Sequence, residues 1–94
     1  MSDLSTRLRE INEALRALID NGAMPLDSLN TSILSEGHGQ KVLVEGGPSG
    51  LIYFASQCLD TVARNVPGAH AHVDEHSGAD AGSIPMIVSL KLED

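Results

Sequence analysis

The residues best suited to chemistry in this chain lie between His70 and Ser83. Imidazole and carboxylate side chains bind metal ions, transfer protons and make polar contacts with partners. The segment is therefore a candidate metal site, catalytic site or polar binding surface. Three of the four histidines and three acidic residues fall within positions 70–80, and these are the candidate binding residues: His70, His72, Asp74, Glu75, His76 and Asp80.

Side chains alternate along an extended strand, so a strand over residues 69–74 would place His70, His72 and Asp74 on one face. Two histidines at positions i and i+2 of a strand can chelate a metal ion, with Asp74 or His76 as a third ligand. The metal-binding alternative therefore uses His70, His72, Asp74 and His76. The order also approaches the His-x-His-x-Asp-His motif of metallo-β-lactamase-fold hydrolases, but Glu75 intervenes before His76, and that fold needs more than twice this length. We assign no catalytic residue and no cofactor, and we do not expect an enzyme.

Composition predicts one small domain over residues 1–94, near the lower size limit for a single hydrophobic core. The chain is 41% hydrophobic but has no Trp, one Phe and one Tyr, so its core must be largely aliphatic. A small core without aromatic volume often depends on a partner subunit. A homodimer is therefore plausible.

The charge balance argues against nucleic acid as a partner. Thirteen acidic residues against six Lys and Arg give a net charge of −7, whereas binding to a phosphate backbone needs clustered Lys and Arg. The single cysteine, Cys58, precludes an internal disulfide and fits a reducing compartment. No apolar run approaches the roughly 18 residues of a membrane span, and no signal peptide is visible. We expect a cytoplasmic protein without membrane contact.

Residues 1–22 read as an amphipathic helix that ends at Gly22. Its apolar residues follow a 4-3-4-3 spacing, which is typical of a helix with one apolar stripe. The stripe either packs on the protein's own sheet or pairs with a second copy of the chain. It consists of Leu4, Leu8, Ile11, Leu15 and Leu18.

Residues 31–94 read as a ββαββ core. Strands at 31–36 and 41–45 flank a short loop with two glycines, which predicts a hairpin with His38 at its tip. The run Gly46–Gly50 opens a second helix that ends near Asn65. Strands are expected at 69–74 and 84–93, the second with Met86 and Val88 on one face and Ser89 on the other. The fold class is α+β, in the order α-β-β-α-β-β, with the helices packed on one mostly antiparallel four-stranded sheet.

The second half of the chain resembles a family of small bacterial proteins, immunity protein family thirty-two of polymorphic toxin systems. The similarity rests on the Gly50-Leu51 helix start, the His70-x-His72-x-Asp74 core and Gly82-Ser83 before the last strand, and it covers about residues 41–92. The resemblance implies a short α+β domain and an immunity role. The N-terminal helix lies outside it.

The leading hypothesis from the sequence is therefore a non-enzymatic binding protein that neutralises a cognate bacterial toxin by direct contact. An acidic inhibitor can be steered electrostatically toward a basic toxin. The alternatives are a His-x-His-x-Asp metal-binding protein or small hydrolase, and a homodimeric structural or regulatory module.

Overall fold

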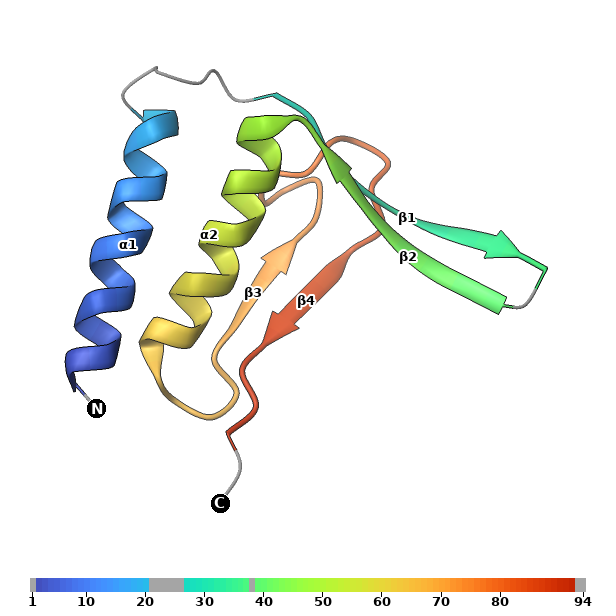
Figure 1. The fold of residues 1–94 in the computed structure, drawn as a ribbon. Helices are drawn as coiled ribbons and strands as arrows, with labels where there is room; N and C mark the ends of the chain where they lie inside the picture. The colour runs from blue at the N-terminus through green and yellow to red at the C-terminus, as the bar shows by residue number, and fades with distance from the viewer. Residues whose placement is uncertain (1, 21–26, 38, 93–94) are drawn as a thin grey trace.

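The computed structural model describes residues 2–20, 27–37 and 39–92. Within them the elements follow the expected order of helix, two strands, helix and two strands (Figure 1). The expected hairpin tip, His38, and the expected helix end, Gly22, lie outside the described residues. The elements are α1 (Ser2–Asp20), β1 (Leu29–Glu36), β2 (Gly39–Gly46), α2 (Pro48–Arg64), β3 (His70–Val73) and β4 (Met86–Ser89).

The strands form two separate two-stranded antiparallel sheets, β1–β2 and β3–β4. The prediction of one four-stranded sheet is therefore wrong, although the α+β class is confirmed. In the first sheet Leu29 is opposite Gly46, and in the second His70 is opposite Ser89. Figure 1 shows the β1–β2 hairpin projecting away from the two helices, while β3 and β4 run beside α2.

The connection between β3 and β4 lies along the edge of β1, where another strand would have paired. Asp80 N donates to Leu29 O at 2.7 Å, and Ile84 N donates to Thr31 O at 2.9 Å. Thr31 N donates to Ser83 Oγ at 3.3 Å, and Thr31 Oγ1 donates to Ile84 O at 2.5 Å. Because loop atoms already occupy these backbone groups of β1, they are not available to β3 or β4.

The last strand is shorter than the predicted range of 84–93. Ile84 is bonded to β1, and Pro85 has no N–H to donate to a strand neighbour. After Ser89, Leu90 N still donates to Ala69 O at 2.7 Å. The pairing with the β3 segment therefore runs one residue past the strand itself.

The second helix contacts strands of both sheets, whereas α1 packs mainly against α2. The prediction that both helices pack on the sheet is thus correct for α2 and wrong for α1. The expected apolar stripe of α1 is only partly buried. Leu8 and Leu15 are half-buried, while Leu4, Ile11 and Leu18 are exposed. A helix that contacts one neighbouring helix can bury only part of a broad apolar stripe.

The core sits where β1, β3 and the connecting loop meet. Leu29 and Val73 are each 1% exposed, and they form one cluster with Ala79 from the loop. The chain's two aromatic rings outside histidine, Tyr53 and Phe54 of α2, pack against this cluster while only partly buried. The core is therefore small and mainly aliphatic, as the composition predicts.

A carboxylate of the chain itself occupies the amino end of α2. Asp27 Oδ1 accepts a hydrogen bond from Gly50 N at 2.8 Å, and Asp27 Oδ2 accepts one from Ser49 N at 3.4 Å. In return, Asp27 N donates to Ser49 Oγ at 2.8 Å. Desolvation raises the pKa of Asp27, but the hydrogen bonds from Gly50 and Ser49 outweigh it and bring the pKa below its usual value.

This arrangement predicts a stability term that is lost in acid. Because the pKa of Asp27 is lower in the folded chain, its contribution is complete above the unfolded pKa of about 3.9 and disappears as the pH falls through the folded pKa. We expect Asp27→Asn to melt at a lower temperature than the parent at pH 7, with the difference narrowing at pH 3. Thermal unfolding followed by circular dichroism measures both; an equal difference at the two pH values would contradict the assignment.

Candidate functional site

The third strand exposes its histidines and buries its apolar residues. His70 and His72 are exposed, whereas Ala71 and Val73 are buried. The buried pair lies on the side that α2 covers. The alternation expected from the sequence therefore places both imidazoles on the outer face of the β3–β4 sheet.

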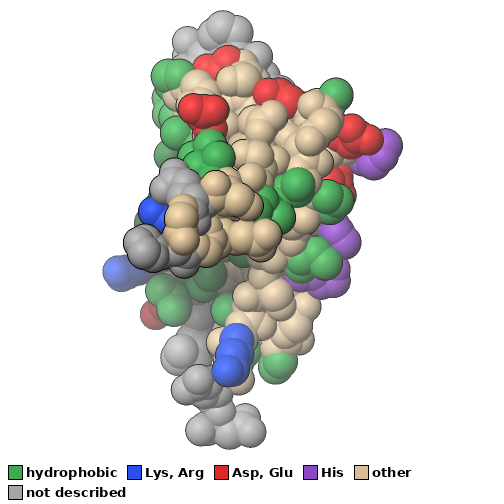
Figure 2. Space-filling model, turned by 90° about the vertical axis from the view of Figure 1, so that its right-hand side faces the viewer, with side chains coloured by type: hydrophobic (Ala, Val, Ile, Leu, Met, Phe, Trp, Pro, Cys, Tyr) green, Lys and Arg blue, Asp and Glu red, His purple; other side chains and the backbone are tan. Residues whose placement is uncertain are grey.

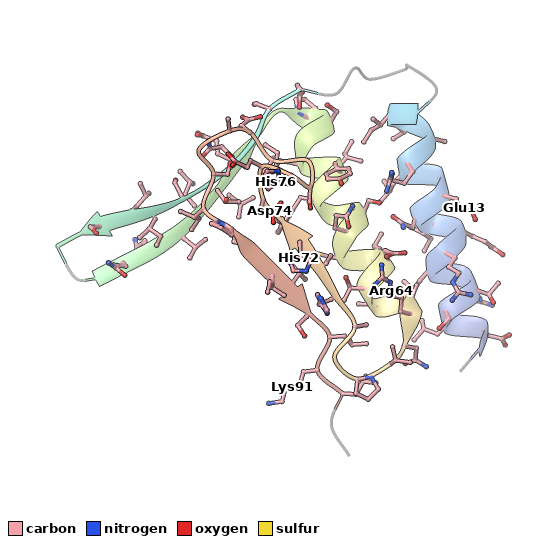
Figure 3. The ribbon with its side chains drawn as sticks, turned by 180° about the vertical axis from the view of Figure 1, so that it is seen from behind. Glu13, Arg64, His72, Asp74, His76 and Lys91 are labelled. Atoms are coloured by element: carbon pink, nitrogen blue, oxygen red, sulfur yellow. The ribbon has the colours of Figure 1, made fainter. Side chains whose placement is uncertain are left out.

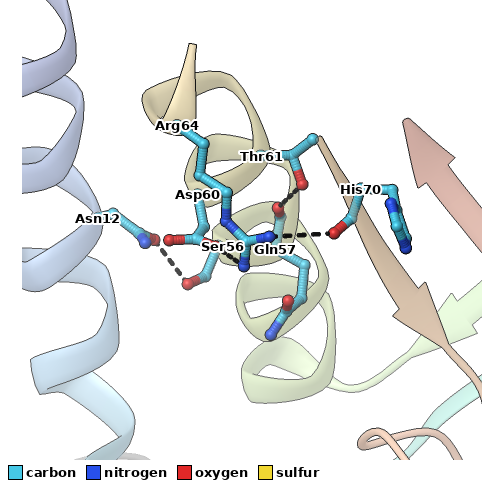
Figure 4. A network of polar contacts seen from close by, with 7 residues as sticks. All are labelled: Asn12, Ser56, Gln57, Asp60, Thr61, Arg64 and His70. Carbon is cyan, nitrogen blue, oxygen red and sulfur yellow. Dashed lines mark hydrogen bonds and ion pairs between the residues drawn. The ribbon is translucent and has the colours of Figure 1, made fainter. Parts of the chain in front are cut away.

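The two imidazoles contact each other edge to face. Their ring centroids are 5.1 Å apart and the ring planes meet at 81°. His70 Nδ1 also lies 3.1 Å from Gly68 O. The start of β3 is fixed to α2 by Arg64, which donates to His70 O at 3.3 Å and forms an ion pair with Asp60 at 2.8 Å (Figure 4). The helix thus positions the strand through the backbone of His70 and leaves its side chain outside.

Asp74 organises the turn that follows β3. Its Oδ1 accepts a hydrogen bond from His76 N at 3.0 Å, and its carbonyl oxygen accepts bonds from Ser77 N and Ala79 N, each at 2.9 Å. Figure 3 shows His72, Asp74 and His76 one after another along β3 and the turn. Asp74 is therefore engaged with the backbone of its own turn.

The remaining acidic candidates have different surroundings. Glu75 Oε1 lies 3.7 Å from His76 Nε2, with side chains 48% and 86% exposed respectively. Glu75 Oε2 also accepts a hydrogen bond from Gly82 N at 3.2 Å. Asp80 is turned toward β1, where its Oδ1 accepts a long bond of 3.4 Å from Leu29 N. The structure thus leaves His70, His72, Glu75 and His76 at the surface and gives Asp80 a contact within the fold.

Two residues of β4 that the sequence reasoning left out of the site lie beside the histidines. Ile87 is opposite His72 and Ser89 is opposite His70 in the strand register. Ile87 is 63% exposed, the largest exposure among the large apolar side chains of the described residues. The signal was present in the sequence, because the alternation that turns Ser89 outward also turns Ile87 outward.

We name the exposed residues of β3, β4 and the turn after β3 the histidine face: His70, His72, Glu75, His76, Ile87 and Ser89. Figure 2 shows the histidine side chains gathered along one border of the molecule, with acidic side chains next to the uppermost of them. The face is open to solvent and combines imidazoles, a carboxylate and an apolar side chain. Such a surface is suited to contact with another macromolecule.

The structure brings His70 and His72 together, and the residues that it describes add no third ligand to them. Among residues 2–20, 27–37 and 39–92, no group of three or more His, Cys, Asp or Glu side chains is placed to hold a metal ion. Cys58 is a free thiol and is half-buried on α2. Neither of the two helices in the described part of the chain is both long and apolar enough to span a bilayer.

Comparison with known proteins gives one match. Searches against curated proteins and against solved structures found no match. The model of the family described as Immunity protein 32 matches residues 41–91, more than half of the chain. The matched range contains α2, β3 and β4 in full, and with them the histidine face. The chain therefore belongs to the Immunity protein 32 family.

Proposed function

We propose that this protein is a non-enzymatic inhibitor that neutralises a cognate bacterial toxin by binding it through the histidine face. The observation that carries the proposal is the exposure of His70, His72 and Ile87 inside the range that matches the immunity family. Large side chains that the fold itself leaves in solvent are available to a partner.

The composition of the face supports a protein partner. Ile87 of β4 provides an apolar centre, and His72 is opposite it on the neighbouring strand β3. Glu75, His76 and Ser89 add exposed polar groups to the face. An apolar centre within a polar rim is the common arrangement of specific protein interfaces, and a few central side chains supply most of the binding energy.

The charge of the chain favours a cationic toxin. A net charge of −7 on 94 residues creates a negative potential that raises the encounter rate with a basic protein. Nuclease toxins act on a polyanion and need a basic groove. A toxin of this kind would be both attracted to the inhibitor and blocked from its substrate by it.

The direct test is protection of a toxin-expressing cell. A candidate toxin domain from a neighbouring gene is expressed with and without this protein, and the two purified proteins are mixed and separated by gel filtration. We expect restored growth and a stable complex. Growth restored without any complex would show that neutralisation does not act by direct binding, and the absence of both would contradict the immunity role for that toxin.

Truncation of the histidine face should weaken the complex. We expect Ile87→Ala and His72→Ala each to raise the Kd at least about tenfold, the loss typical of a central interface side chain. Ile33→Ala is the matched control, because Ile33 is also an exposed isoleucine of a strand, at 50%, but lies on the hairpin. Calorimetric titration of the three variants measures the effect; equal losses for Ile87→Ala and Ile33→Ala would place the contact elsewhere.

A further inference from the structure

The two helices form an antiparallel pair whose contacts define which sides face each other. Ser56 Oγ donates to Asn12 Oδ1 at 2.6 Å, and the guanidinium carbon of Arg16 lies 5.4 Å from the ring centre of Tyr53 (Figure 4 shows the first contact). Residue numbers thus rise along α1 as they fall along α2. Asn12 and Ser56 mark the line along which the helices meet.

Each helix carries a row of exposed apolar side chains beside this line. On α1 the row is Leu4, Ile11 and Leu18, which are 53%, 52% and 42% exposed and are spaced seven residues apart, about two helical turns. On α2, Leu51 and Val62 are 43% and 42% exposed, and Ala55 between them is also exposed.

The two rows lie on the same side of the helix pair. Successive residues of a helix are turned by about 100° around its axis, so the α2 row lies roughly 120° around the axis from Ser56. The buried Thr61 lies on the other side of Ser56 around the same axis. On α1 the row lies roughly 100° around the helix axis from Asn12. Arg16, which covers Tyr53, lies on the other side of Asn12. In an antiparallel pair these rotations bring both rows to the side opposite the sheets. We name this surface the apolar helix face: Leu4, Ile11, Leu18, Leu51, Ala55 and Val62.

We propose that the apolar helix face binds a second copy of this chain, so that the protein is a twofold-symmetric dimer joined through a four-helix interface. Counted from the Asn12–Ser56 and Arg16–Tyr53 contacts, Leu18 is level with Leu51. Ile11 and Leu4 each lie within about one helical turn of the level of Ala55 and Val62 respectively, which gives three apolar layers across the face. A twofold axis through the middle layer places the outer layers of the two copies on each other, as a self-complementary interface requires. This inference does not depend on the immunity role.

The distribution of charge favours a second copy over a charged partner. The two charged residues of α2, Asp60 and Arg64, pair with each other, and Arg64 reaches His70 of β3, on the side away from this face. On α1, the charged residue on the same side of the helix as the row is Arg7, which lies between Leu4 and Ile11. Two chains that each carry −7 repel through their acidic surfaces, and a nearly neutral face is where they can approach. Homodimer interfaces are more apolar than other surfaces and poor in charged residues.

The helix pair supplies more than half of the area that a standard dimer interface buries on each partner. Helices of 19 and 17 residues, with a rise of about 1.5 Å per residue and a width of about 10 Å each, span roughly 500 Å² in projection. Side-chain relief adds to this footprint, and a standard interface buries about 800 Å² per partner.

The monomer core gives a further reason for a second copy. Among the described residues, the large apolar side chains with under 2% exposure are Leu29 and Val73, while five side chains of the same size class on the helix pair are 42–53% exposed. A dimer would bury those five side chains and hold α1, which packs mainly against α2, between two neighbours.

Sedimentation equilibrium of the full chain tests the proposal. We expect the parent to be a dimer at 100 µM, and we expect Ile11→Glu and Leu51→Glu each to raise the dimer Kd at least about 100-fold. The control is Ile33→Glu, since Ile33 and Ile11 are the same residue type with 50% and 52% exposure on different surfaces. Raising NaCl from 0.05 to 0.5 M should leave the dimer intact, because an apolar interface is not screened by salt.

Several results would overturn it: a monomeric parent at 100 µM, a dimer that salt dissociates, or equal weakening by Ile33→Glu and Ile11→Glu. A monomeric parent whose toxin binding is abolished by Ile11→Glu would assign this face to the toxin instead. Circular dichroism identifies any variant that fails to fold. If both helix variants unfold, the mass of the parent and its response to salt still decide the question.

Discussion

Gly50→Ala is expected to destabilise the protein by about 3 kcal/mol, although alanine is the better helix former. A Cβ at position 50 would fall on the backbone oxygen of Ser28 and lie 2.9 Å from its carbonyl carbon. Those atoms belong to the backbone entering β1 and have no alternative rotamer. The same Cβ would lie 3.2 Å from Asp27 Oδ1, the oxygen that accepts the hydrogen bond from Gly50 N.

The consequence should be visible as a large fall in melting temperature. At roughly 4–8 °C per kcal/mol for a chain of this size, the expected fall is about 12–24 °C. Gly37→Ala is the matched control, because a Cβ at Gly37 would meet nothing within 4 Å and the residue does not require a positive φ. We expect its melting temperature to stay close to that of the parent. A Gly50→Ala protein as stable as Gly37→Ala would show that β1 and α2 do not approach as closely as described.

The order of elements could be predicted because each element has a local cause. The 4-3-4-3 spacing of α1 and the alternation of β3 are properties of neighbouring residues. The end of α2 is equally local: Asn65 adopts a left-handed conformation with φ of 53°, and its N–H bonds back to Val62 O. Such features need no knowledge of distant parts of the chain.

The sheet arrangement could not be predicted, because it depends on contacts about 50 residues apart. Thr31 and Ser83 are bonded across 52 positions of the sequence. Nothing in the alternation of either strand shows that a loop hydroxyl, rather than another strand, will accept the hydrogen bond from Thr31 N. Long-range pairing of this kind depends on packing and loop geometry more than on local propensity.

The candidate site was also predicted only in part, because local spacing is visible in the sequence and long-range contacts are not. His70 and His72 share a face because they are two positions apart, which is one full strand period. Asp80 was grouped with them by sequence proximity, yet its backbone N–H and carboxylate are both bonded to Leu29. The alternation of β4 shows that Ile87 points outward, but its position opposite His72 arises only once β3 and β4 are in register. Proximity along the chain was thus a poor guide to proximity on the surface.

Leu29→Ala is expected to destabilise the protein by about 3 kcal/mol, within the range for truncation of a fully buried leucine. Leu29 is 1% exposed and packs with Val73 and Ala79 in the small core. Domains of this size have total stabilities near the lower end of about 5–15 kcal/mol, so the loss would be a large fraction of the whole. Leu34→Ala removes the same atoms from the same strand at a position that is 38% exposed, and should cost much less. Urea unfolding of both variants measures the difference; similar midpoints would show that the β1 end next to the loop is no better packed than the projecting end of the hairpin.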